Sequence, residues 1–192
     1  MPCEGAPVAI PAVKILRSSN LEAVDLSGAD LSNRDLRNSN FGGSNLSHSV
    51  LDGSDLRGAD LSFSIMAESS CVGANMSYSN LSWSSLRHTD LSGSNLREAS
   101  ILNACMSGSV LTGADLTGCD LTGSDMSWAN LNESVLINAN LTDVSLIGAR
   151  LLGADLRGAI LHGTRLKECK YNHGTRLPRG VDPLARGMIL VP

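Results

Sequence analysis

Side chains that could bind a metal recur in this chain at a fixed interval. His48, Glu68 and His88 follow one another at equal spacing, and imidazole and carboxylate groups are common ligands of divalent metals. If segments of 20 residues, the interval between these side chains, stack about 4.8 Å apart, the two imidazoles lie about 9.6 Å from each other. With three ligands visible, a carboxylate paired with partly protonated imidazoles is the simpler interpretation. We therefore predict no metal and no other cofactor.

A second candidate set is acidic. Asp115, Asp120 and Asp125 recur at every fifth position, inside a segment (96–145) that contains six acidic side chains and a single basic one. Carboxylates at regular spacing can imitate the spaced phosphates of a nucleic acid. These three residues are therefore predicted to form an acidic binding surface.

Catalytic chemistry finds little support. The sequence contains no Gly-rich phosphate-binding loop, nucleophile elbow or zinc motif, so we expect no enzyme activity. Its five cysteines lack paired spacing and suit a reducing compartment. The N-terminal stretch MPCEGAPVAIPAVKIL lacks the basic segment of a secretory signal, and no apolar run in the sequence is long enough to span a membrane. We expect a soluble, cytoplasmic protein.

A repeat with a period of five must position all of these side chains. Stepping by five from Leu16 to Tyr171 gives 32 positions, called centres here, of which 24 are Leu. Two positions before a centre stands a small residue in 30 of 31 cases, and one position before it stands Asp or Asn in 18 of 31. Two positions after a centre, 14 of 32 residues are Gly. Neither a helix nor a simple strand has a period of five.

The chemistry of each position predicts a square coil. A large and a small apolar residue separated by one polar residue point to the same side of an extended backbone. The Asp or Asn between them points outward and can accept a hydrogen bond from the backbone two positions on, and Gly supplies the positive φ of a tight turn. Four such corners close one coil, so that the fifth centre lies above the first. The 32 centres then make about eight coils, a rod of roughly 38 Å.

This pattern defines three segments. Residues 16–171 are predicted to form the repeat rod, whose interior is filled by the column of Leu side chains. Residues 1–15 are expected to cap the first coil and residues 172–192 to cap the last, because a bare coil presents unpaired backbone groups that invite polymerisation. An all-β solenoid with capped ends follows.

The repeats resemble those of the pentapeptide-repeat family, whose motif is [STAV][DN][LF][STR][G]. The segments that carry the resemblance are ADLSN (29–33), SDLRG (54–58), ADLTG (114–118) and ADLRG (154–158). The resemblance covers residues 16–171 and implies a right-handed quadrilateral β-helix. The tail is similar to the ending of cyanobacterial members, some of which modulate developmental regulators. Other members protect DNA topoisomerases by mimicking DNA.

Outward aromatic side chains mark a candidate partner site. Phe63 and Trp83 share one column in successive coils, and Tyr78 stands one corner before Trp83. Exposed aromatic residues are favoured anchors of protein interfaces, although they can also shield neighbouring backbone. We therefore predict that these three residues bind a partner.

The function predicted from the sequence is a non-enzymatic, protein-binding scaffold or regulator. Its partner is a protein that the sequence does not identify. The alternative is a DNA-mimicking inhibitor or protector of a DNA topoisomerase (gyrase) acting through Asp115, Asp120 and Asp125. Direct nucleic-acid binding is not expected, because no continuous basic stripe exists, and no membrane partner is expected. The rod is predicted to be a monomer or a homodimer formed through its C-terminal end.

Overall fold

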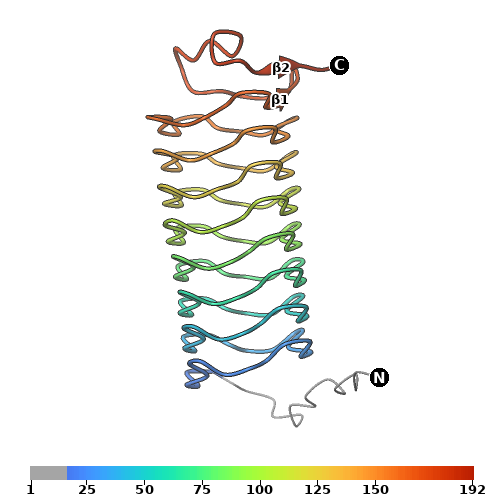
Figure 1. The fold of residues 1–192 in the computed structure, drawn as a ribbon, viewed down its shortest axis with the longest axis vertical. Helices are drawn as coiled ribbons and strands as arrows, with labels where there is room; N and C mark the ends of the chain where they lie inside the picture. Colours follow the sequence, from blue (N-terminus) through green and yellow to red (C-terminus); the bar gives the residue numbers. More distant parts are fainter. Residues whose placement is uncertain (1–16) are drawn as a thin grey trace, which may run out of the picture.

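The chain forms a rod of stacked coils (Figure 1). The computed structural model describes residues 17–192, so the cap expected over residues 1–15 lies outside the described part. In Figure 1 the coils follow one another along the long axis from blue to red. Parallel bridges join equivalent positions of successive coils, beginning with Asn20 and Asn40. The predicted right-handed quadrilateral β-helix is confirmed.

Four ladders of bridges run along the rod, and each joins eight residues, one from each of the expected eight coils. We call each of these residues a rung, and all of them except Arg176 stand one position before a centre. We call the surface around each ladder a wall and name it by the first and last residue of its ladder. The four are the 20–160, 25–165, 30–170 and 35–176 walls, in their order around the coil.

Each corner is a tight turn whose third residue has a positive φ. The Ala29 N–H donates to the Leu26 carbonyl at 3.0 Å, and Gly28 between them has a φ of +67°. Every corner position from 18 to 168 shares this conformation, whether or not it is occupied by Gly. The outward Asp stabilises the turn as predicted, because Asp25 Oδ1 accepts the Ser27 N–H at 3.0 Å.

The core is a continuous column of centres. Those from Leu26 to Leu156 are buried, and the small residues two positions earlier line the column. Serine is tolerated there because its hydroxyl usually returns a hydrogen bond to backbone: Ser54 Oγ donates to the Leu51 carbonyl at 2.7 Å. The interior is thereby occupied by side chains, and only outward positions are left to carry function.

The C-terminal tail folds onto the last coil (Figure 1). Strand β1 (Lys170–Tyr171) pairs in parallel with strand β2 (Ile189–Leu190). Met188 is only 4% exposed, and Leu177 and Val181 pack against the core. The bridge between Asp155 and Arg176 is one position longer than the bridges before it, so the repeat frame shifts where the tail begins. The tail therefore covers the end of the Leu column.

Candidate protein-binding surface

The corners place four aromatic side chains in solvent. Phe63, Tyr78, Trp83 and Trp128 are corner residues with a φ between +58° and +63°, and all four are exposed. A positive φ is unfavourable for a bulky residue, because its Cβ crowds the following carbonyl. Glycine occupies many equivalent corners without that cost. The aromatic side chains are therefore retained where the backbone would favour glycine.

Two of these rings stack on one another. The ring centroids of Phe63 and Trp83 are 6.4 Å apart and their planes differ by 4°. Phe63 is 65% exposed and Trp83 is 57% exposed, and Ile65 beside them is exposed as well. Tyr78, 70% exposed, stands at the preceding corner and makes no ring contact with the stack within residues 17–192. The predicted trio is thus a stacked pair plus a separate residue across the 20–160 wall.

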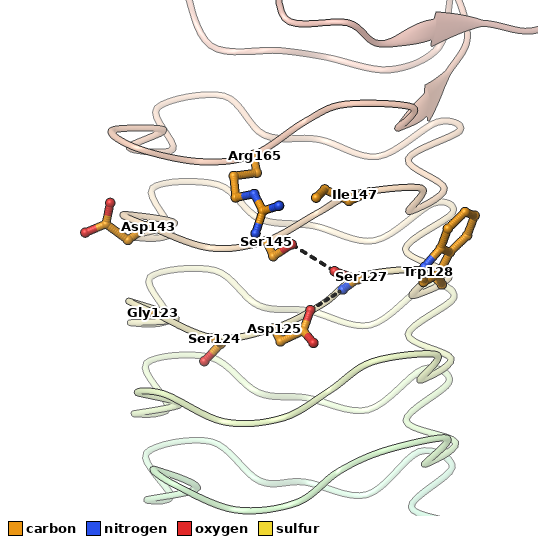
Figure 2. A pocket seen from close by; sticks show the side chains of 9 residues that line it. All are labelled: Gly123, Ser124, Asp125, Ser127, Trp128, Asp143, Ser145, Ile147 and Arg165. Carbon is orange, nitrogen blue, oxygen red and sulfur yellow. Dashed lines mark hydrogen bonds between the residues drawn. The ribbon is translucent and has the colours of Figure 1, made fainter.

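Trp128 stands at the opposite corner of the 25–165 wall from the stacked pair, because it follows Trp83 by two coils and one corner. Between its corner and that of Asp143 lies a shallow groove of about 440 Å³ (Figure 2). Figure 2 shows the Asp125, Ser145 and Arg165 side chains along the wall between these two corners. Trp128 was not among the residues predicted from the sequence to bind a partner. The signal that could have found it is its interval from Trp83, which leads to the other edge of the same wall.

Some polar side chains of the groove already make hydrogen bonds within the protein, whereas another has no ion-pair partner. Asp125 Oδ1 accepts the Ser127 N–H at 3.0 Å, and the Ser127 and Ser145 hydroxyls lie 2.8 Å apart. Within residues 17–192, the Arg165 guanidinium has no carboxylate at ion-pair distance. The groove therefore offers an indole face, a carboxylate and an unpaired guanidinium to a partner.

The 35–176 wall is the opposite case, because its charges neutralise one another. Arg37 Nη2 lies 2.6 Å from Asp35 Oδ2, and this hydrogen bond lowers the pKa of the Asp35 carboxyl to about 2. The same pairing recurs at Arg57–Asp55 (2.7 Å) and Arg157–Asp155 (2.7 Å), and Arg97 pairs with Asp115 of the next coil (3.2 Å). Burial acts to raise the pKa of Asp115, but hydrogen bonds from Thr117 and Arg97 outweigh it and the net shift is downward. Such exposed pairs stabilise little.

The three predicted acidic residues do not form one patch. Asp115, Asp120 and Asp125 belong to three different ladders, so they lie on three successive walls of one coil. Their neighbours on those ladders are uncharged: Asn95 and Val135, Ser100 and Asn140, Cys105 and Ser145. Each carboxylate also accepts an N–H from two positions on, at 3.0–3.1 Å. Their first role is to hold the turns.

The histidine column divides into a pair and a single residue. His48 Nδ1 lies 3.6 Å from Glu68 Oε2. His88 instead leans over the next coil, because a Cβ added to Gly108 would meet its ring at 2.6 Å. In the part of the chain that the structure describes, no three His, Cys, Asp or Glu side chains gather as metal ligands. Residues 17–192 also contain no helix long and apolar enough to cross a membrane.

The chain belongs to the pentapeptide repeat family. The family model for pentapeptide repeats matches eight copies, over residues 15–53, 54–93, 74–113, 107–136 and 134–170. The predicted family membership is confirmed. No curated protein gives a significant match.

Similar solved structures are also pentapeptide repeat proteins. The chain is 33% identical to alr5209 from Nostoc Pcc 7120, over 53% of this chain and 84% of that one, with a TM-score of 0.53. It is 26% identical to HetL, a protein involved in heterocyst differentiation regulation in Nostoc sp. strain PCC 7120, over 92% of this chain and 86% of that one (TM-score 0.45). It is 26% identical to QnrB1, a plasmid-mediated fluoroquinolone resistance protein, over 84% and 89% of the two chains (TM-score 0.49).

Proposed function

We propose that this protein is a non-enzymatic, cytoplasmic rod that binds another protein through its 25–165 wall and acts as a scaffold or regulator. The observation that carries the proposal is the placement of three exposed aromatic residues, Phe63, Trp83 and Trp128, at the two corners of this wall. Aromatic residues dominate the binding energy of protein interfaces, because they bury a large area at a small cost in side-chain entropy.

The dimensions of the wall favour a protein partner over a small molecule. Phe63 and Trp128 are just over three coils apart, about 15 Å along the rod. An interface of standard size covers roughly 800 Å² on each partner and would span all three aromatic residues. The groove beside Trp128 is too open to enclose a small ligand, whereas a partner surface could cover it.

Charge also favours this wall over the opposite one. From Asn45 to Ser145, Asp125 is the one charged rung of its ladder, while the 35–176 wall carries the recurrent Asp–Arg pairs described above. Removing paired charges from water costs free energy that their attraction only partly returns. A partner that covers apolar side chains therefore binds the 25–165 wall at a lower desolvation cost.

The test is a pull-down from the source cell with wild-type protein and variants, each at low and high salt. We expect a partner retained at high salt and lost from Phe63→Ala/Trp83→Ala and from Trp128→Ala. Tyr78→Ala is the matched control, because Tyr78 is an equally exposed corner aromatic that does not border this wall. If the partner is lost from Tyr78→Ala but retained by Trp128→Ala, the binding site lies on the 20–160 wall instead. That result would support the predicted set of Phe63, Tyr78 and Trp83.

DNA mimicry is the second candidate, and a specific charge distribution favours it. Residues 17–145 contain 15 acidic and six basic side chains. A mimic attracts a topoisomerase by charge, so its binding weakens steeply with salt. DNA mimicry would replace the proposal above if a topoisomerase is recovered with wild-type protein at low salt but not at high salt, and not with the Asp115→Asn/Asp120→Asn/Asp125→Asn variant.

Sedimentation of the purified protein tests whether it is a monomer or a C-terminal-end homodimer.

A further inference from the structure

A second hollow lies at the C-terminal end of the rod, away from the 25–165 wall. Its lining comes from the last complete coil, at Arg157, Gly158 and Ala159, and from the tail, at Leu177, Pro178 and Arg179. Its volume is about 630 Å³, within the range of about 300–1,000 Å³ that small-molecule sites occupy. The tail and the coil each contribute one guanidinium and an apolar surface.

The two arginines leave an excess of positive charge beside this hollow. Arg157 is held by Asp155, whose Oδ1 and Oδ2 accept from its Nε and Nη2 at 2.9 and 2.7 Å. Arg176 Nη1 shares the same carboxylate at 3.5 Å. Arg179 has no carboxylate at ion-pair distance among residues 17–192. Two guanidinium groups thus share a single carboxylate, and the third has none.

The net charge of the C-terminal end of the rod is also positive. Residues 146–192 contain eight basic and three acidic side chains, whereas residues 17–145 contain six basic and 15 acidic ones. The rod is therefore negative along most of its length and positive at the end that contains the hollow. A field of this kind raises the local concentration of small anions.

We propose that the hollow between the last coil and the tail binds a small amphipathic anion. The ligand has an apolar body, which rests on Ala159, Leu177 and Pro178, and one carboxylate or phosphate group, which accepts hydrogen bonds from Arg179 and from the free Nη1 of Arg157. Arginine suits both anions, because its planar fork matches two oxygens at once. The site is separate from the proposed protein-binding wall and does not depend on it.

Such a ligand also joins the tail to the coil. Half of the lining belongs to residues 177–179, so the ligand binds fully only when the tail is in place. Binding to the folded form alone shifts the unfolding equilibrium by mass action. The melting temperature is therefore expected to rise with ligand concentration.

The experiment is calorimetric titration of the full chain with octanoate and with octyl phosphate. We expect saturable binding with a dissociation constant on the order of 1 mM or below. Octanol, acetate and inorganic phosphate are the control ligands, because each supplies only the apolar body or only the anion. Preference for octanoate or for octyl phosphate distinguishes a carboxylate from a phosphate ligand, and binding of either one supports the site.

Two protein variants locate the binding. Arg179→Gln should weaken it about tenfold, as expected for the loss of one charge-assisted hydrogen bond. Arg150→Gln is the matched control, because Arg150 is an exposed arginine of the same basic end on the 30–170 wall, and it should bind as wild type. If both variants bind the ligand equally weakly, the loss reflects the general positive charge of this end, and the proposed site is wrong.

Amide NMR shifts on the wild-type protein test the location without a variant. Octanoate should shift the signals of Gly158, Ala159 and Arg179 and leave those of the 25–165 wall in place. Absence of saturable binding at millimolar octanoate and octyl phosphate, or shifts confined to other residues, would overturn the proposal.

Discussion

The packing of Trp128 on the next coil can be measured by placing one methyl group under its ring. A Cβ added to Gly148 would lie 2.5 Å from two ring atoms of the Trp128 indole, closer than any real contact. Gly113 is a matched reference, because it has the same φ of +67° and no heavy atom within 4 Å of the added Cβ. Both Ala substitutions impose the same backbone strain, but only Gly148→Ala displaces the indole.

The magnitude follows from the covered surface. Alanine in the left-handed conformation costs roughly 1–2 kcal/mol, partly offset by the smaller entropy of the unfolded chain, so Gly113→Ala should destabilise the protein by about 1 kcal/mol. Trp128 is 65% exposed, so about a third of its surface is covered. For a side chain of about 250 Å² that is roughly 90 Å², or about 2 kcal/mol if all of it is lost. Gly148→Ala should therefore be less stable than Gly113→Ala by up to about 2 kcal/mol.

The assay is urea unfolding of both variants, followed by circular dichroism, with tryptophan emission recorded in the native state. Gly148→Ala should shift the emission to longer wavelength, because the indole enters water, and Gly113→Ala should leave it unchanged. Equal midpoints and equal emission spectra for the two variants would refute the packing of Trp128 on Gly148.

Three further outcomes are expected. In a Cys3→Ser background, Cys105 should react first with a thiol reagent. Burial raises the pKa of the other three thiols, those of Cys71, Cys119 and Cys169, to about 12. Equal labelling of all four cysteines in native protein would contradict this prediction. Asp35 has a depressed pKa, so its contribution to stability is present above its unfolded value of 3.8 and is lost as the pH falls toward about 2. Acid unfolding of Asp35→Asn should accordingly show a shallower pH dependence in that window than wild type. Ser94→Ala should melt at or above the wild-type temperature, because Ser94 Oγ is buried and has no hydrogen-bond partner among residues 17–192. Ser54→Ala should melt lower, since it loses a hydrogen bond.

Much of the fold could be predicted because the repeat has no insertion. Counting in steps of one coil placed Phe63 and Trp83 in one column, and the structure stacks their rings. The same arithmetic separates Asp115, Asp120 and Asp125 onto three walls, since a step of five is one corner and not one coil. The predicted acidic surface treated residues that follow one another around the rod as if they were stacked along it.

The direction in which a corner side chain leans was harder to predict, because it depends on the residue at the same corner of the next coil. His88 shows this: its ring covers Gly108 in the next coil, while His48, followed by Glu68, pairs with that carboxylate. The frame of the tail was also outside the pattern. One additional position in the step to Arg176 brings Leu177 and Arg179 beside the last coil, and no repeat position indicates it.

Glycine at a corner therefore has two effects. It adopts the positive φ without strain, and it leaves room for the side chain of the preceding coil to lie flat on the backbone, as Trp128 does on Gly148. Where two large residues follow one another in a corner column, that room is missing, and they must contact each other or project into solvent. Phe63 and Trp83 contact each other, and most of both residues is still exposed. A stacked, solvent-exposed pair that the backbone does not require is the feature of this rod that a binding partner explains best.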